Sequence, residues 1–396
     1  MFLEAKDVKV STKIDTQIAS REFYSRPEDE RYADLAALAT AVQANEDASV
    51  ASPPFPLANL AIEPRADGQG VLMGQAGMLD PSKGLGADPT PWAFSQVASL
   101  IGSPAGYLRS KSPESIARNM TEDVQALTVQ GDERYVKAYV RKTPDGEVKG
   151  TLRALNGRDY TRLHDSWIVA KLQGLESQGW LVPPTWDGKP AGLYYSDRDL
   201  WAMMIDSPEA SLVLRDKHSD RTESLHHMVI LWNSVTGYKS IGACICWLNA
   251  VCGNHLLWGV RSMMQFRFRH RGTSLQSRAT KALNAAFEVA ALPAAEDDKD
   301  GILRAMDAKL ADDDAKLVEV MVRRTGLPKS TVLDGITIAR EEGSDPLYAW
   351  GAVQGLTALA RTRNHADRRA ELDWAAASLM PQPKGGKKAS TVTVDV

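Results

Sequence analysis

The alternation of apolar and polar positions predicts β-hairpins in the first half of the chain. In "ERYVKAYVRKTPDGEVKGTLRAL" (133–155), two alternating runs flank the turn signal "TPDGE". "LANLAIEPRADGQGVLMGQAGML" (57–79) has the same form around "ADGQG". Successive side chains of a strand point to opposite faces, so one face of the 135–141 run carries Tyr135, Lys137, Tyr139 and Arg141.

Helical starts are marked by a capping residue that is followed by proline. Thr90 before Pro91, and Ser112 before Pro113, predict helices over "TPWAFSQVASLIGS" and "SPESIARNMTEDVQALT". Asp165 is the expected cap of a helix over 163–175, "LHDSWIVAKLQGL". "GKPAGLYYSDRDLWAMMID" (188–206) is interpreted as a strand, a turn and a helix.

The segment 225–252, "LHHMVILWNSVTGYKSIGACICWLNAVC", predicts two strands around the turn "NSVTGYK". From Ser274 to about Met380 the apolar spacing is helical. The expected fold is α+β, with a central mixed or antiparallel sheet built from hairpins, flanking helices and a helical C-terminal region.

The organisation follows from shifts in composition. Residues 1–55 are expected to be a peripheral segment and linker, 56–292 an α+β core domain, 293–380 a helical region, and 381–396 a disordered tail.

Composition describes an ordinary globular chain of 396 residues, 43% hydrophobic and 24% charged, with a formal net charge of -3. Any basic surface must therefore be local. The three cysteines lie between 244 and 252, which argues against a disulfide framework and for a reducing compartment. The N-terminus shows no apolar leader and the chain no convincing membrane span, so we expect a cytoplasmic protein.

One long window contains no acidic residue. Between Lys239 and Phe287 there are seven Lys or Arg and no Asp or Glu. Within it "FRFRHRG" alternates, so a strand there would present Arg267, Arg269 and Arg271 on one face. Guanidinium groups suit phosphate oxygens, and such contacts make binding dependent on salt. The alternative to a nucleic-acid contact for this segment is an exposed strand whose arginines pair with acidic neighbours. For the 135–141 strand, the alternative is an ordinary solvated strand face.

These two segments supply the predicted nucleic-acid contacts, which are Lys239, Arg261, Arg267, Arg269, His270, Arg271, Lys137, Tyr139 and Arg141.

Metal and catalytic motifs are weak. Cys244, Cys246, Cys252 and His255 lack the spacing of paired zinc knuckles, and buried cysteines are common in cores. His226 and His227 have acidic residues nearby in sequence, but no established catalytic motif surrounds them. The sequence assigns no catalytic residue, cofactor or metal.

The stretches "LWNSVTGYKS", "NAVCGNHLLWG" and "FRHRG" together resemble the phage/plasmid-like protein family known as domain of unknown function 932. The flanks "GRDYTRLHDSWIVAKL" and "WGAVQGLTALART" are also similar to that family, so the resemblance runs from about residue 90 to 380. The motif residues Asn233, Ser234, Gly237, Tyr238, Cys252 and Asn254 are interpreted as structural, because Asn, Ser and Gly fix tight turns.

The resemblance implies a role in the DNA metabolism or recombination of a mobile element, or in evasion of host defence, within a bacterial host cell. The leading hypothesis is a single-stranded DNA-binding protein, annealing-like and homo-oligomeric, with host or phage replication proteins as further partners. Two alternatives stay open. One is a nucleic-acid-processing enzyme with a carboxylate and histidine metal site, and the other is a host-interaction protein that does not bind DNA.

Overall fold

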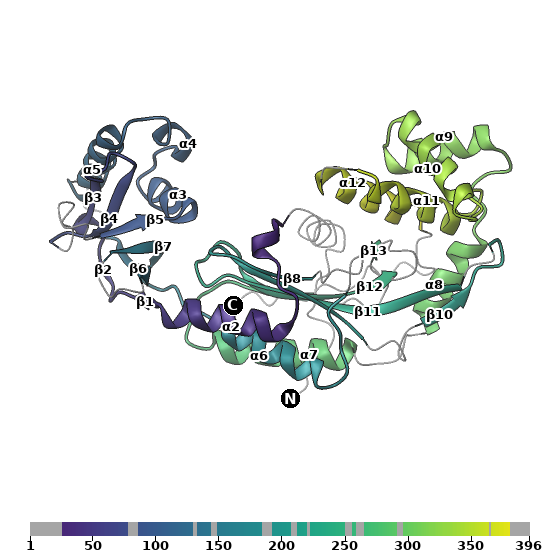
Figure 1. Ribbon diagram of the computed structural model, residues 1–396, viewed down its shortest axis with the longest axis horizontal. Coiled ribbons are helices and arrows are strands. Elements are labelled where there is room, and N and C mark those ends of the chain that lie inside the picture. Colours follow the sequence, from purple (N-terminus) through teal and green to yellow (C-terminus); the bar gives the residue numbers. More distant parts are fainter. Residues whose placement is uncertain are drawn as a thin grey trace.

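The computed structural model describes residues 26–77, 86–129, 133–143, 149–183, 192–206, 212–219, 222–249, 256–258, 265–290, 296–363 and 366–380. Along its long axis the molecule has a small sheet at one end, a longer sheet in the middle and a group of helices at the other end (Figure 1). The α+β class predicted from the sequence is confirmed, and the strands form two sheets.

The first sheet is mixed and has the strand order β1-β6-β7-β5-β4-β3, with β2 beside β6. Only the β5–β7 pair is parallel among these strands. The strands are β1 (Ser49–Ala51), β2 (Phe55–Pro56), β3 (Leu60–Pro64), β4 (Val71–Gln75), β5 (Gly86–Pro89), β6 (Tyr135–Lys142) and β7 (Lys149–Gly157). Both predicted hairpins are present, as β3–β4 and β6–β7.

Helices pack against this sheet and begin at the expected caps. They are α3 (Pro91–Leu100), α4 (Ala105–Leu108) and α5 (Pro113–Val129), with the short 3₁₀ turn η3 (Leu57–Asn59). Thr90 Oγ1 accepts a hydrogen bond from the Ala93 amide at 3.1 Å, and Ser112 Oγ accepts one from the Ser115 amide at 3.4 Å. The helices and strands share one apolar core, so residues 55–155 pack as a unit, which we call the first unit.

The second sheet is entirely antiparallel among its described strands, with the order β13-β12-β11-β9-β8; β10 also pairs with β11, and β14 with β12. The strands are β8 (Leu193–Tyr195), β9 (Leu200–Ile205), β10 (Leu212–Arg215), β11 (Thr222–Asn233), β12 (Ile241–Asn249), β13 (Leu256–Trp258) and β14 (Gln265–Phe268). The long β11–β12 hairpin matches the prediction for 225–252.

The run "LWAMMI" (200–205) is strand β9, and the helix predicted there is wrong. All six of its side chains are buried, and the strand pairs with β8 on one side and β11 on the other. A short apolar run that is buried on both faces has no periodicity to separate strand from helix, so tertiary pairing decides.

Three helices cover one face of the second sheet (Figure 1): α2 (Leu35–Asp47), α6 (Asp165–Glu176) and α7 (Leu275–Ala290). Leu35, Leu38 and Val42 of α2 are fully buried in the core they form. Before α2, the 3₁₀ turn η2 (Glu28–Glu30) follows Arg26, whose guanidinium donates two 2.9 Å hydrogen bonds to Asp199. The N-terminal segment is therefore not peripheral, because its apolar helix face completes the central core.

The C-terminal part is helical, as predicted. It comprises α8 (Glu296–Asp307), α9 (Asp314–Thr325), α10 (Lys329–Glu341), α11 (Ala349–Arg361) and α12 (Ala366–Ala377). Every residue of α11 from Ala349 to Ala360 is buried. Leu214 and Leu225 of the second sheet join the apolar cluster of these helices, so the region packs directly on that sheet.

Among the described residues, no helix is both long and apolar enough to span a membrane. The tail that the sequence predicts to be disordered, 381–396, lies outside the described residues.

The crossing of α10 and α11 depends on two glycines, which gives the first prediction. A Cβ at Gly355 would lie 2.2 Å from the Gly335 carbonyl oxygen and 2.7 Å from the Ala339 Cβ. Gly355→Ala should therefore lower the free energy of unfolding by about 2 kcal/mol, measured by urea denaturation.

The matched control is Gly174→Ala in α6, where an added Cβ would meet nothing within 4 Å. This substitution should raise stability by about 0.5–1 kcal/mol, because alanine favours a helix interior over glycine. Equal effects of the two substitutions would contradict the close crossing.

Candidate nucleic-acid interface

The turn between β11 and β12, residues 234–240, joins the second sheet to the first unit and the segment that follows it. Three successive carbonyl oxygens of this turn, those of Ser234, Val235 and Thr236, accept hydrogen bonds from side chains outside the second sheet. The donors, in the same order, are Tyr160 Oη at 2.9 Å, Arg162 Nε at 3.0 Å and Asn156 Nδ2 at 2.9 Å.

The Thr236 carbonyl also accepts from the indole of Trp92 at 3.2 Å and from the amide of Gln96 at 3.3 Å. Both donors belong to α3, so a helix and the strand β7 of the first unit both bind this one oxygen. The turn carbonyls are therefore buried together with their hydrogen-bond donors. A buried carbonyl without a donor would carry a desolvation cost, and this contact avoids it.

The polar motif residues hold the turn in shape. Ser234 Oγ donates to the Arg198 carbonyl at 2.6 Å and accepts from the Tyr238 amide at 2.9 Å. Gly237 has φ +85°, and a Cβ there would lie 3.1 Å from Asn156 Nδ2. A left-handed residue in close contact with a neighbouring chain segment favours glycine.

Asn233, the last residue of β11, connects the turn to the start of α6. Its Nδ2 donates to the Leu163 carbonyl at 2.9 Å and to Asp165 Oδ1 at 2.7 Å. Asp165 is therefore not the helix cap that the sequence suggested, since its buried side chain bonds across to Asn233. Burial raises the pKa of Asp165 to about 7.

The stretch "FRFRHRG" (266–272), which we call the basic segment, adopts the alternation of buried and exposed side chains that its sequence predicts. Phe266, Phe268 and His270 are buried, whereas Arg267, Arg269 and Arg271 are exposed. Arg267 Nε donates to Ser240 Oγ at 2.5 Å, which places this strand beside the turn.

The His270 side chain points into the protein interior and not to solvent. Its ring stacks on Tyr160 with centroids 5.1 Å apart, and its Nδ1 lies 3.2 Å from the Thr161 carbonyl oxygen. Burial lowers the pKa of His270 to about 4, so the ring is neutral near pH 7. The expectation that His270 contacts nucleic acid is corrected, because only 5% of the residue is exposed.

The other predicted basic strand, β6, contributes less than expected. Tyr139 is 2% exposed and packs between the guanidiniums of Arg162 and Arg153, at 3.9 and 5.1 Å from its ring centroid, so it cannot stack a base. A register shift between Tyr139 and Val140 breaks the alternation there. Arg141 is paired with Asp197 at 2.6 Å.

Two predicted lysines are also engaged. Lys137 Nζ donates to the Tyr160 carbonyl at 2.8 Å, and burial lowers its pKa. Lys239 lies 2.8 Å from Asp199, and only 19% of its side chain is exposed. The remaining predicted residues, Arg261, Cys252 and Asn254, lie outside the described residues.

The segment after β7 brings the two predicted basic strands together. Tyr160 forms a β-bridge with Arg271, and the Thr161 amide donates to the His270 carbonyl at 2.9 Å. Two residues before Tyr160, exposed Arg158 lies over the ring of Tyr135, 5.7 Å from its centroid. We call the exposed set Tyr135, Arg158, Arg267, Arg269 and Arg271 the basic band.

Arg158 and the exposed Arg198 were not predicted. Arg198 lies 5.5 Å from the ring centroid of Tyr238, which is 39% exposed. The only sequence signal for Arg158 is its place in the family-like stretch "GRDY" (157–160), and exposure cannot be read from that stretch.

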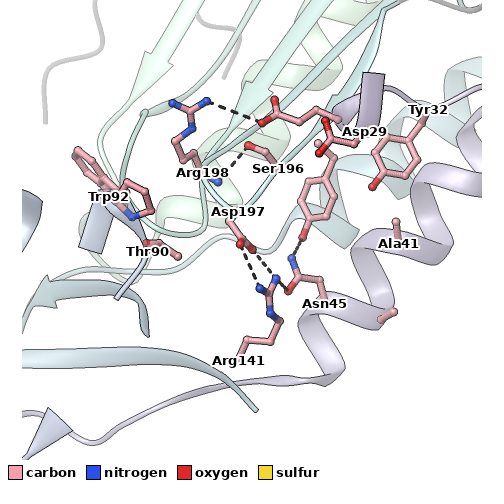
Figure 2. A pocket seen from close by; sticks show the side chains of 14 residues that line it. Asp29, Tyr32, Ala41, Asn45, Thr90, Trp92, Arg141, Ser196, Asp197 and Arg198 are labelled. Atoms are coloured by element: carbon pink, nitrogen blue, oxygen red, sulfur yellow. Dashed lines mark hydrogen bonds and ion pairs between the residues drawn. The ribbon is translucent and has the colours of Figure 1, made fainter. Parts of the chain in front are cut away.

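A pocket of about 660 Å³ lies between α2, the start of α3 and the β8–β9 turn (Figure 2). Arg141 donates to Asp197, and Asn45 donates to the Tyr195 hydroxyl at 2.6 Å. Arg198, the other arginine of the pocket, lies 3.9 Å from Glu30. Both arginines have carboxylate partners, so the pocket offers no unpaired cation to a phosphate.

A Ser–His–Asp chain lies on the second sheet. Ser224 Oγ is 3.2 Å from His226 Nε2, and His226 Nδ1 is 3.2 Å from Asp206 Oδ1. These contacts resemble a nucleophile, a base and an orienting acid. Leu225, the next residue after the serine, is paired with strands on both sides, so its amide points at a neighbouring strand and not into an oxyanion site.

In the described part of the chain, no three His, Cys, Asp or Glu side chains are grouped as metal ligands. Cys244 is buried in the apolar cluster on the face of the second sheet opposite to α2, α6 and α7.

The protonation of Asp165 gives the second prediction. Its folded-state pKa of about 7 lies above the usual carboxyl value of about 3.9, so the folded chain keeps a proton that the unfolded chain releases. This group's contribution to stability therefore falls as pH rises from about 4 to about 7. In Asp165→Asn that fall should disappear while the bond from Asn233 is kept.

The measurement is urea unfolding of wild type and variant across this pH range. The variant should gain stability relative to wild type as pH rises. Parallel curves would show that Asp165 is already ionised in the fold at low pH.

The comparisons with known proteins bear on the central part of the chain. No curated protein and no solved structure matches it. Residues 155–302 match the family model described as Domain of unknown function (DUF932), a narrower range than the resemblance predicted from the sequence. These residues include the 234–240 turn, the basic segment and the whole second sheet. Residues 155–302 of this chain are thus similar to the DUF932 family.

Proposed function

We propose that the protein binds single-stranded nucleic acid along the basic band. The observation that carries the proposal is the row of guanidiniums of Arg267, Arg269 and Arg271. All three are exposed, and in the described part of the chain no carboxylate lies within ion-pair distance of any of them.

Three arginines elsewhere contrast with this row because each has a carboxylate partner. Arg65 is paired with Asp67 and Asp88, Arg340 with Asp314, and Arg368 with Glu371. Unpaired exposed guanidiniums on neighbouring positions repel one another, and phosphate groups would relieve that repulsion while releasing counterions.

Exposed aromatic rings beside the arginines favour single strands. Tyr135 is 41% exposed under Arg158, and Tyr238 is 39% exposed beside Arg198. Stacking of an unpaired base on such a ring contributes about 1–3 kcal/mol and requires no particular sequence. A base held in a duplex cannot reach these rings.

The setting and assembly belong to the same proposal. The family resemblance supports a role in the DNA metabolism of a phage or plasmid in the bacterial cytoplasm, with an annealing-like activity and a homo-oligomeric state. The Ser224–His226–Asp206 chain gives less support to an enzyme, because the amide of Leu225, the residue after the serine, is directed at a neighbouring strand.

The third prediction concerns Arg267→Ala combined with Arg269→Ala. Both side chains are exposed, so the fold should be retained. The slope of log affinity against log salt should become shallower by about 1.4, which is about 0.7 for each lost phosphate contact on a single strand. The measurement is fluorescence anisotropy with a labelled mixed-sequence oligonucleotide at several salt concentrations.

The control is Arg118→Ala combined with Arg368→Ala, which removes the same charge from exposed positions on α5 and α12. It should leave the slope unchanged. An equal loss in both double variants, or none in either, would remove the basic band from the binding site. Loss of the oligonucleotide itself in the presence of magnesium would point to a nuclease.

A further inference from the structure

Helices α9 and α10 are joined by a short turn of defined conformation. Gly326 ends α9 with φ +70°, and its amide donates to the Val322 carbonyl at 2.9 Å. Leu327 and Pro328 follow, and α10 begins at Lys329. A three-residue turn that contains glycine is the type of connection found between the two helices of a helix-turn-helix.

The apolar residues of this pair face inward onto a third helix. Leu317 and Met321 of α9, Leu327 of the turn, and Val332 and Ile336 of α10 are all buried in one cluster. The same cluster contains Trp350, Val353 and Leu356 of α11. A buried third helix fixes the relation of the first two, as in three-helix DNA-binding units.

The opposite face of α10 is exposed, and its Asp334 accepts a hydrogen bond from Arg363 at 3.3 Å. In its first nine residues the exposed side chains recur at the spacing of one helical face and are Lys329, Ser330, Leu333, Asp334 and Thr337. Leu333 is 45% exposed, which is unusual for a large apolar side chain in this chain. Lysine reads guanine, serine and threonine bond to either base of a pair, and an apolar group contacts the thymine methyl.

Charge is separated along the helix pair. Exposed Arg323, Arg324 and Lys329 gather at the turn, where α10 also presents its positive helix end. Acidic residues gather at the other end of α9, at Asp312 to Asp314, and Arg340 at the end of α10 is paired there with Asp314. The turn end is therefore the end that suits phosphate groups.

We propose that α9, the 326–328 turn and α10 form a helix-turn-helix that binds double-stranded DNA, with α10 in the major groove. This surface is separate from the basic band, since it lies in the helical group at the far end of the molecule from the first sheet (Figure 1). The chain then has two nucleic-acid surfaces, one for single strands and one for duplex.

The fourth prediction uses Arg324→Ala combined with Lys329→Ala in the full-length chain. Anisotropy with a labelled mixed-sequence duplex should show a salt slope shallower by about 1.8, about 0.9 for each lost phosphate contact on B-DNA. Binding of the single-stranded oligonucleotide should be unchanged. The Arg267→Ala, Arg269→Ala variant should show the reverse pattern.

The matched control is Lys309→Ala combined with Lys316→Ala, which removes equal charge near the acidic end, where these lysines contact Asp312 and Glu319. It should leave duplex binding unchanged. An equal loss in control and test variant, no duplex binding by wild type, or duplex binding that depends on Arg267 and Arg269 would overturn the proposal.

A second measurement tests base reading. Selection of duplexes from a random pool by the wild-type chain should enrich a short motif, and Leu333→Ala combined with Thr337→Ala should lose that enrichment while keeping salt-dependent binding. Retention of the same motif by the variant would exclude α10 as the reading helix.

Discussion

The hydrogen bonds from Tyr160, Arg162 and Asn156 to three successive carbonyls of the 234–240 turn hold the two sheets together. Tyr160 has the widest role, because its hydroxyl binds the turn, its ring stacks on His270 and its backbone bridges Arg271. The exposed arginines of the basic segment are thus positioned by the same residue that fastens the turn. The stretches "GRDY", "LWNSVTGYKS" and "FRHRG", which are distant in sequence, meet at this contact.

Local signals predicted much of the fold. Alternation and turn residues located the β3–β4, β6–β7 and β11–β12 hairpins, and capping pairs located the starts of α3 and α5. These features depend on neighbours a few residues away, which is why one sequence carries them. The division into two sheets, and the strand at 200–205, depend on long-range pairing and could not be read locally.

The candidate site was only partly predicted, because some of its features are local in sequence and others depend on distant residues. The alternation around Arg267 follows from its own segment, whereas the partners of other cations come from elsewhere. Lys239 lies in a window free of acids and is nevertheless paired with Asp199, which belongs to the β8–β9 turn. Tyr139 lies on the expected face of its strand, but two arginines cover it. Charge along a sequence window therefore overestimates the charge available at the surface.

The burial of α2 has a consequence for the order in which the chain gains its structure during synthesis. The core of the first unit contains only residues from 55 to 155. Because this unit is contiguous and emerges early from the ribosome, it can fold before the rest of the chain is made. Leu35 and Leu38, although made before that unit, belong with Val42 to a core whose other members follow it, and α2 packs mainly against α6 and β8. The amino-terminal helix therefore remains unpacked while the first unit, which follows it in the chain, is translated, and it docks only after that unit has been made.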